Sequence, residues 1–322
     1  MLLALIGLAT SACGGQGSAQ AQGTDSQGTT SSQQQGSFDQ DAVGQAIGKD
    51  LDSKGSGVYE VDFPRTDIQV TSQSGQTRGL SLDPSLDLGS EIYFQQIGDG
   101  SAMVMGELVL TEDEVDPVLT QLEQGGVDMT ALHKHQPEET PSIWWLHVHS
   151  HGDPVQIAKT LRSALDQTGT PSKVDTSRLQ TQEEVIDSGQ LDQILGYQGQ
   201  VEGGVYKYDI PYGGTITDTS TNTTVSPKIE AAGSSGIFFQ PTGGGKAITN
   251  GELLLTEDEV NPVAKALRDN NIEVVSLHNH FLDEEPRTFF MHFWGYDDAT
   301  TLAQGLRAAL DKMNVGKSSA GG

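Results

Sequence analysis

The chain carries one segment twice, and this repeat limits its fold more than any other feature. GELVLTEDEVDPV begins at Gly106 and GELLLTEDEVNPV begins at Gly251, an offset of 145 residues that holds without a gap over residues 93–166. Further upstream, GVYEVDFP matches GVYKYDIP. A duplication of this length indicates two homologous domains rather than one large one. The predicted domains are residues 39–167 and 190–315, joined by a linker at residues 168–189.

The order of elements within each copy predicts an α+β fold. The strand GELLL is followed by a helix, a strand, a hairpin turn, another strand and an amphipathic helix over residues 298–313. A proline inside a helix removes a hydrogen bond, so we expect the first helix to begin at Pro262 after the cap Asn261, as Pro117 does after Asp116. The order resembles a split β-α-β or ferredoxin-like arrangement, in which an antiparallel sheet carries helices on one face.

The charge balance limits the partners of the chain. With 18 Lys and Arg against 44 Asp and Glu, the formal net charge is −26, and no basic patch interrupts it. Phosphate backbones and anionic lipid surfaces would be repelled, so we predict no nucleic-acid partner. The acidity is typical of a highly soluble or salt-adapted protein, and attraction of a cationic partner such as a metal is the alternative.

The N-terminal residues indicate export. MLLALIGLATSA, residues 1–12, is an apolar run of signal-peptide length that is too short to span a bilayer. It precedes Cys13, the single cysteine of the chain, so disulfides and cysteine zinc sites within one chain are excluded. TSAC resembles a bacterial lipobox, which predicts a signal peptide at residues 1–13 and a membrane lipid on Cys13; a plain signal peptide is the alternative. Residues 14–38 are a predicted disordered tether and residues 316–322 a disordered tail.

All histidines of the chain fall in two equivalent windows. The first window holds His133, His135, His147, His149 and His151, and the second holds His278, His280 and His292. Within each window the residue numbers of the histidines are all odd or all even, and successive side chains on a strand alternate between its two faces. The histidines of one copy therefore share a sheet face if the two strands of the hairpin pair in an even register, and are split by an odd one.

The offset separates shared positions from private ones. His133, His135, His147 and Glu139 correspond to His278, His280, His292 and Glu284, whereas His149 and His151 correspond to Trp294 and Tyr296. Three neutral imidazoles and one carboxylate suit a divalent ion, Zn first, with Cu, Mn or Fe as alternatives. Two other interpretations stay open: a metal-free polar pocket, and histidines that only hydrogen-bond a carboxylate such as Glu284.

These motifs resemble a known family. LTEDEVNPV, LHNHFLDEEPRTFFMHFWG and LRAALD are similar to the LppY/LpqO family of bacterial lipoproteins, and the resemblance covers about residues 58–166 and 205–311. The first copy departs from the pattern, because it lacks an arginine matching Arg287 and has WWLHVH in place of FFMHFW. The resemblance implies an exported, often lipid-anchored protein, and it implies no established reaction.

Three functions follow as hypotheses. The first is an extracytoplasmic lipoprotein of the cell membrane that binds a divalent metal or a small ligand at the histidine face of each domain. The second is a metal-dependent hydrolase or oxygenase with Glu284 as ligand or general base. The third is a metal-free module that binds a glycan or an envelope protein through its aromatic residues. Nucleophilic catalysis lacks support because G-x-S-x-G is absent and PTGGGK, residues 241–246, is typical of a hairpin turn.

Overall fold

The structure contains both copies of the repeat. The computed structural model describes residues 38–171 and 186–317, here called the first half and the second half, and both lie in the unit Gln35–Gly322. The predicted signal peptide (residues 1–13), most of the tether (14–37), the middle of the linker (172–185) and the end of the tail (318–322) lie outside the described residues.

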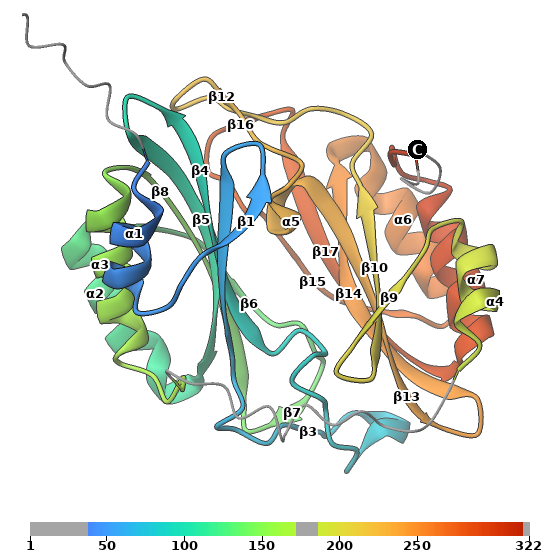
Figure 1. The fold of residues 1–322 in the computed structure, drawn as a ribbon. Helices are drawn as coiled ribbons and strands as arrows, with labels where there is room; N and C mark the ends of the chain where they lie inside the picture. Colours follow the sequence, from blue (N-terminus) through green and yellow to red (C-terminus); the bar gives the residue numbers. More distant parts are fainter. Residues whose placement is uncertain (1–37, 172–185, 318–322) are drawn as a thin grey trace, which may run out of the picture. The chain divides into compact units, whose positions relative to one another are not determined.

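The first half is an antiparallel six-stranded sheet with the order β1-β2-β4-β5-β8-β6. Its strands are β1 (Asp52–Gly55), β2 (Val58–Pro64), β4 (Gly89–Gly98), β5 (Ser101–Thr111), β6 (Asp128–His133) and β8 (Ile143–Gly152), with the short strands β3 (Thr71–Ser72) and β7 (Glu139–Thr140) paired beside it. Its helices are α1 (Gln40–Ile47), α2 (Val115–Gly125) and α3 (Pro154–Leu165), with 3-10 turns η1 (Gly75–Thr77) and η2 (Glu112–Glu114). The three α-helices cover one face of the sheet (Figure 1), where Ile47, Leu122 and Leu161 join its buried side chains in one core.

The second half repeats this plan with the sheet order β9-β10-β13-β14-β17-β15. Its strands are β9 (Gln200–Glu202), β10 (Val205–Pro211), β13 (Ser234–Gly243), β14 (Lys246–Thr256), β15 (Glu273–His278) and β17 (Thr288–Asp298), with β11 (Thr217–Asp218), β12 (Thr223–Thr224) and β16 (Glu284–Glu285) in a separate small sheet. Its helices are α4 (Ser188–Leu195), α5 (Glu230–Gly233), α6 (Glu257–Asp269) and α7 (Ala299–Leu310). Leu191, Leu267 and Leu306 pack α4, α6 and α7 onto one face of the sheet.

The predicted α+β class and split β-α-β connection are confirmed. In the first half, β5 leads through α2 to β6, and β8 lies between these two strands and is antiparallel to both. In the second half, β17 lies between β14 and β15 in the same way. The main helices occupy one face of each sheet, as the sequence predicts, whereas the short helix α5 packs with Met103 and Met105 of the first half on the opposite face.

The predicted start of the first helix of each copy is wrong. In the second half α6 begins at Glu257, five residues before Pro262, and Thr256 and Glu259 form a reciprocal capping box. The backbone N–H of Thr256 donates to the Glu259 carboxylate at 2.7 Å. These side-chain bonds satisfy the first free N–H groups of the helix, which offsets the one hydrogen bond that Pro262 cannot make. In the first half the equivalent residues form the 3-10 turn η2, and α2 begins at the next residue, Val115.

The sheet faces opposite these main helices pack against each other. Trp145, Val109, Ile248 and Trp294 belong to one buried cluster that draws on both halves. Two equivalent glutamines add reciprocal hydrogen bonds across the halves: Gln95 donates to the Thr224 carbonyl at 2.7 Å and Gln240 to the Ser81 carbonyl at 2.9 Å. Among the described residues no helix is both long enough and apolar enough to cross a membrane.

Candidate metal centre

The hairpin strands β6–β8 and β15–β17 aim the shared histidines at one another. His133 pairs with Trp145 and His147 with Ala131, and the equivalent pairs in the second half are His278 with Phe290 and His292 with Ser276. This register is even, the alternative under which the histidines of one copy share a face. That face is the one directed toward the other half.

The six shared histidines meet as three stacked pairs, each with one ring from each half. The ring centroids lie 3.6 Å apart for His133 and His278, 3.7 Å for His135 and His292, and 3.8 Å for His147 and His280. Under the repeat, His133 corresponds to His278, while the other two pairs exchange with each other. The contact is therefore reciprocal, as in a two-fold dimer interface.

Two glutamates that the sequence analysis did not select complete this group. The Glu107 carboxylate on β5 lies 2.8 Å from His147 Nε2 and 3.2 Å from His135 Nε2. The Glu252 carboxylate on β14 lies 3.4 Å from both His280 Nε2 and His292 Nε2, and 3.9 Å from His278 Nε2. Each glutamate pairs directly with a histidine across the sheet, Glu107 with His147 and Glu252 with His292. We call these six histidines and two glutamates the buried cluster.

A signal for these glutamates was present in the repeat itself. Glu107 and Glu252 are the second residues of GELVL and GELLL, the best-matched segments of the two copies. A charged residue kept at one position of two otherwise apolar strands needs a partner inside the protein.

Backbone carbonyls fix the orientation of two rings. His292 Nδ1 lies 3.0 Å from the carbonyl of Gly251, and His280 Nδ1 hydrogen-bonds the carbonyl of Ala231. An imidazole that donates from Nδ1 in its neutral form carries a lone pair on Nε2. His292 Nε2 then faces His133 Nε2 at 3.1 Å, and His280 Nε2 faces His278 Nε2 at 2.9 Å.

Gly251 is required for this arrangement. Its φ is +141°, and a Cβ at this position would lie 2.1 Å from the carbonyl oxygen of Gly236 on the neighbouring strand. Only glycine tolerates this backbone next to another strand. The glycine of GELLL thus places both the carbonyl that holds His292 and the glutamate that follows it.

Burial keeps the second half of the buried cluster uncharged. Desolvation, together with the positive charge of neighbouring histidines, lowers the pKa of His278, His280 and His292 well below the usual range. Desolvation and repulsion from Glu107 raise the pKa of Glu252 well above its usual range. The environment of this half therefore favours neutral rings and a protonated carboxyl.

The first half instead contains an ion pair. Burial lowers the pKa of His135, but Glu107 and Asp87 together have the larger effect and raise this pKa to about 10. His135 and His147 in turn hold the pKa of Glu107 well below its usual range, against the effect of its burial. Asp87 reaches His135 Nδ1 at 2.7 Å. His133, which burial and the neighbouring rings keep neutral, has a lowered pKa.

Four sets of these residues could hold a metal ion, because their ligand atoms all lie within 4.8 Å of one another. The sets are His147, Glu252, His278 and His280; His133, His278 and His292; Asp87, His135 and His292; and Glu107, His133 and His147. They overlap, and three of them combine residues of both halves. All six shared histidines that the sequence proposed as ligands are thus brought together.

The structure places Glu139 and Glu284 elsewhere. Glu139 accepts from Lys134 Nζ at 2.6 Å and from the N–H of Ile143 at 2.8 Å, and Glu284 accepts from the N–H of Thr288 at 2.9 Å. Within the described residues no hydrogen bond or ion pair joins either carboxylate to a histidine. Both carboxylates instead form hydrogen bonds within the turn of their own hairpin. The carboxylates of the buried cluster come from β5 and β14.

The two private histidines of the first copy form a separate group. His149 and His151 continue β8 beyond His147 and meet Asp218 of the second half, and the three could also hold a metal ion. Burial and the adjacent His151 lower the pKa of His149 to about 4. The sequence separated these two residues from the shared set, but gave no sign of Asp218 as their partner.

Comparison with solved structures finds distant likenesses. The trimeric bacterial microcompartment shell protein PduB is 12% identical, covering 83% of this chain and 96% of its own, with a TM-score of 0.23. The double ringed trimeric shell protein MSM0271 from the RMM microcompartment is 15% identical over 66% of this chain and 82% of its own, with a TM-score of 0.18. EtuB from Clostridium kluyveri is 12% identical over 81% and 89%, with a TM-score of 0.19. Scores this low carry no argument about this protein.

No curated protein matches the chain. A family model does match it, over residues 41–167 and again over residues 189–312. These regions correspond to the two halves and make up well over half of the sequence. The protein therefore belongs to the family described as Domain of Unknown Function (DUF1259), with two tandem copies of its domain.

Proposed function

We propose that the buried cluster binds two divalent cations, one in each half. Each ion would be held by one glutamate oxygen and by histidine Nε2 atoms: Glu107 with His133, His135 and His147, and Glu252 with His278, His280 and His292. Zn²⁺ suits imidazole and carboxylate ligands best, and Cu, Mn or Fe are the alternatives. The observation that carries the proposal is the convergence of histidine Nε2 atoms and a glutamate oxygen in each half.

The distances support it. Ligand atoms of one tetrahedral zinc lie about 3.3 Å apart when each is about 2.05 Å from the ion. His133 and His135 Nε2 are 3.0 Å apart, His278 and His280 Nε2 are 2.9 Å apart, and Glu107 lies 3.2 Å from His135 Nε2. Each spacing is within a few tenths of an ångström of the value for a shared ion. Two lone pairs at such a distance repel each other unless a cation or a proton lies between them.

Burial and charge support it as well. A metal ligand must be a deprotonated imidazole, and the lowered pKa values of His133, His278, His280 and His292 keep these four rings neutral. Glu252 Oε2, a ligand atom of the second ion, is buried without a hydrogen-bond partner. Rings this deeply enclosed, with His280 and His292 both at 0% exposure, favour an ion held inside the protein over a hydrolase or oxygenase centre that admits a substrate.

Metal analysis of untagged protein tests the proposal. The protein is stripped with a chelator, loaded with Zn²⁺, Mn²⁺, Cu²⁺ or Fe²⁺, dialysed, and assayed for metal by elemental analysis. We expect two interior equivalents that are lost in the double variant His133→Gln/His278→Gln. The double variant Glu139→Gln/Glu284→Gln is the matched control, because its carboxylates lie in the hairpin turns, and it should keep both. Equal metal content in all three proteins would favour the metal-free pocket.

We also propose that the chain is an exported lipoprotein of the LppY/LpqO type, held at the cell membrane by a lipid on Cys13. The support is the apolar run before TSAC and the absence of other cysteines. Incorporation of labelled palmitate into the wild type, lost in Cys13→Ser, is the expected result. A secreted protein that carries no label in either form would favour a plain signal peptide. A small-molecule, glycan or envelope-protein ligand remains compatible with this location.

A further inference from the structure

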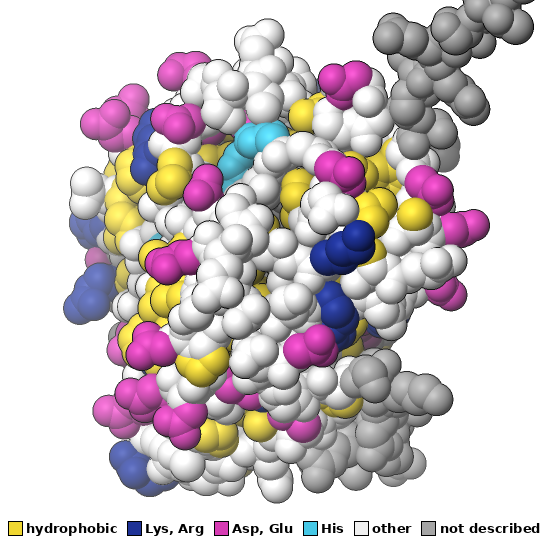
Figure 2. Space-filling model, turned by 90° about the vertical axis from the view of Figure 1, so that its left-hand side faces the viewer, with side chains coloured by type: hydrophobic (Ala, Val, Ile, Leu, Met, Phe, Trp, Pro, Cys, Tyr) yellow, Lys and Arg dark blue, Asp and Glu magenta, His cyan; other side chains and the backbone are white. Residues whose placement is uncertain are grey.

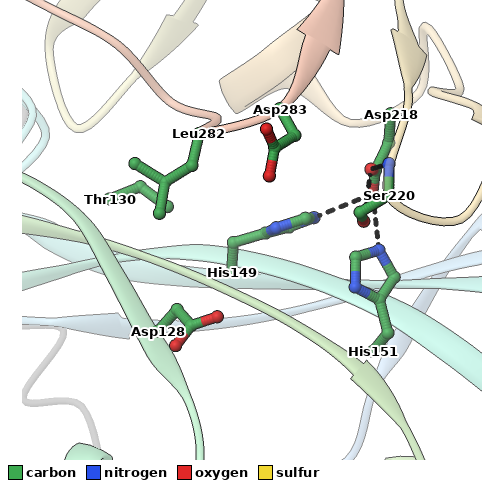
Figure 3. Close-up of a pocket in the computed structure, with 8 residues that line it drawn as sticks. All are labelled: Asp128, Thr130, His149, His151, Asp218, Ser220, Leu282 and Asp283. Carbon is green, nitrogen blue, oxygen red and sulfur yellow. Dashed lines mark hydrogen bonds and ion pairs between the residues drawn. The ribbon is translucent and has the colours of Figure 1, made fainter.

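A pocket of about 90 Å³ opens beside the buried cluster, where the halves meet. Strand β8 contributes His149 and His151, and β11 of the second half contributes Asp218 (Figure 3). Asp128 and Asp283 also line it, so the pocket is strongly acidic. On the face shown in Figure 2, histidine reaches the surface in a patch among acidic and uncharged side chains.

Asp218 is held in position by the chain that follows it. One of its carboxylate oxygens, Oδ1, accepts from the N–H of Ser220 at 2.9 Å and from its hydroxyl at 2.7 Å. The other oxygen, Oδ2, lies 2.5 Å from His151 Nε2 and 3.3 Å from His149 Nε2. The Asp218 side chain is 0% exposed, and its Oδ2 contacts both rings. The carboxylate is therefore preorganised before any ligand arrives.

The two rings reach this oxygen from different directions. Their planes are 85° apart with centroids at 4.5 Å, and His149 Nε2 is buried without a hydrogen bond of its own. Two imidazoles and one carboxylate on one side of a pocket leave the remaining coordination positions to water. That donor set is used by exchangeable and catalytic metal sites, whereas structural sites are closed by protein ligands.

We propose that His149, His151 and Asp218 form a third divalent-cation site, open to solvent and distinct from the buried cluster. Its two histidines correspond to Trp294 and Tyr296 in the second half, so the site exists once per chain although the fold is duplicated. The side chains of His149 and His151 are 12% and 22% exposed, against 0% for His280 and His292. An ion here is reachable by chelators, and it exchanges faster than any ion in the interior.

Zinc titration of the metal-stripped full chain tests this site. Isothermal titration with Zn²⁺ should give one weaker equivalent that is lost in His149→Gln/His151→Gln. Asp218→Asn is the second variant, because its amide oxygen can still accept from Ser220 while the ligand charge is removed. Circular dichroism establishes that each variant is folded. An unchanged number of equivalents with unchanged affinity in both folded variants would overturn the proposal and leave Asp218 as a hydrogen-bond partner only.

The controls separate this site from the interior ones. His133→Gln/His278→Gln alters the buried cluster and should retain the weaker equivalent. Stopped-flow removal of Co²⁺ by a chelator, followed through its visible absorption, should show one fast phase in the wild type and in this variant, and none in His149→Gln/His151→Gln. If the interior binds no metal, the fast phase alone remains, and the third site stands without it. A fast phase that persists in His149→Gln/His151→Gln contradicts the assignment.

Discussion

The two halves present the same ligand geometry with different charge. Each contributes three histidines and one glutamate at equivalent positions, and the stacked pairs are reciprocal. In the first half Asp87 faces His135 Nδ1, whereas the equivalent His280 faces only the backbone carbonyl of Ala231. Glu107 accordingly has a lowered pKa and Glu252 a raised one. The duplication thus reproduces the position of the ligands, and residues outside the motif decide their protonation.

The difference has a direct effect on cation affinity. A cation entering the first half meets two carboxylates but must displace the proton of His135, whose pKa is about 10. In the second half it meets neutral rings and must displace only the proton of Glu252. Binding at either place releases a proton, so affinity in both halves rises with pH.

Acidification should have the largest effect on the metal-free protein. His133, His278, His280 and His292 are neutral when folded, whereas in the unfolded chain they take up protons below about pH 6.5. Their contribution is complete above that pH and is lost as pH falls, by about 1.4 kcal/mol per pH unit for each ring. Glu252, with its raised pKa, acts in the opposite direction. Because four rings oppose one carboxyl, we expect these groups together to lower the free energy of unfolding from pH 7 to pH 5, measured by urea unfolding of chelator-treated protein.

Because three of these rings lie in the second half, the comparison can be tested ring by ring. His280→Gln should flatten the pH dependence of stability, whereas His135→Gln should not, since His135 is protonated in both folded and unfolded states at acidic pH. Equal flattening by both variants would show that the two halves share their protons evenly.

The next largest difference in stability is expected between Glu107→Gln and Glu252→Gln. In the metal-free protein at neutral pH, Glu107→Gln leaves the charge of His135 short of a partner, and breaking a buried pair costs about 3 kcal/mol. Glu252→Gln exchanges one neutral group for another of similar shape, and its loss should stay below about 1 kcal/mol. Equilibrium unfolding in urea with chelator present measures both. A larger loss for Glu252→Gln than for Glu107→Gln would reverse the assignment of charge.

Asp87→Asn should weaken one interior ion and spare the other. A carboxylate hydrogen-bonded to a ligand histidine typically contributes about 10- to 100-fold to metal affinity. Competition with a chromophoric chelator should therefore resolve one weakened equivalent and one unchanged. Asp99→Asn, in the exposed turn between β4 and β5, is the control and should change neither. Two equivalents weakened alike would indicate a single shared site.

The smallest effects on metal binding should come from Glu139→Gln and Glu284→Gln. Each amide keeps an acceptor for the hairpin N–H groups, so we expect a loss of about 1 kcal/mol in the free energy of unfolding. Metal content should not change. Loss of metal in either variant would restore the ligand role that the sequence predicted for these residues.

The sequence predicted the histidine side of the buried cluster well and the carboxylate side poorly. His278 and His292 lie on two strands joined by one hairpin turn. Their common sheet face follows from the even spacing of their residue numbers, which can be seen within one short segment of the sequence. Glu252 lies on β14, which pairs with β17 only after a helix and another strand intervene. Closeness along the chain favoured Glu284 instead. The contact between the two histidine faces depends on how the halves pack together. The residue pattern within one copy does not predict that packing.

The reciprocal pairing of the rings also bears on the origin of the chain. His133 and His278 stack across the pseudo-two-fold relation, and the other two pairs exchange under it. A polypeptide with a single copy of this domain could assemble the same arrangement by forming a homodimer. Fusion of the two copies would then have freed each to vary on its own, and the added histidines of β8 are what such freedom permits.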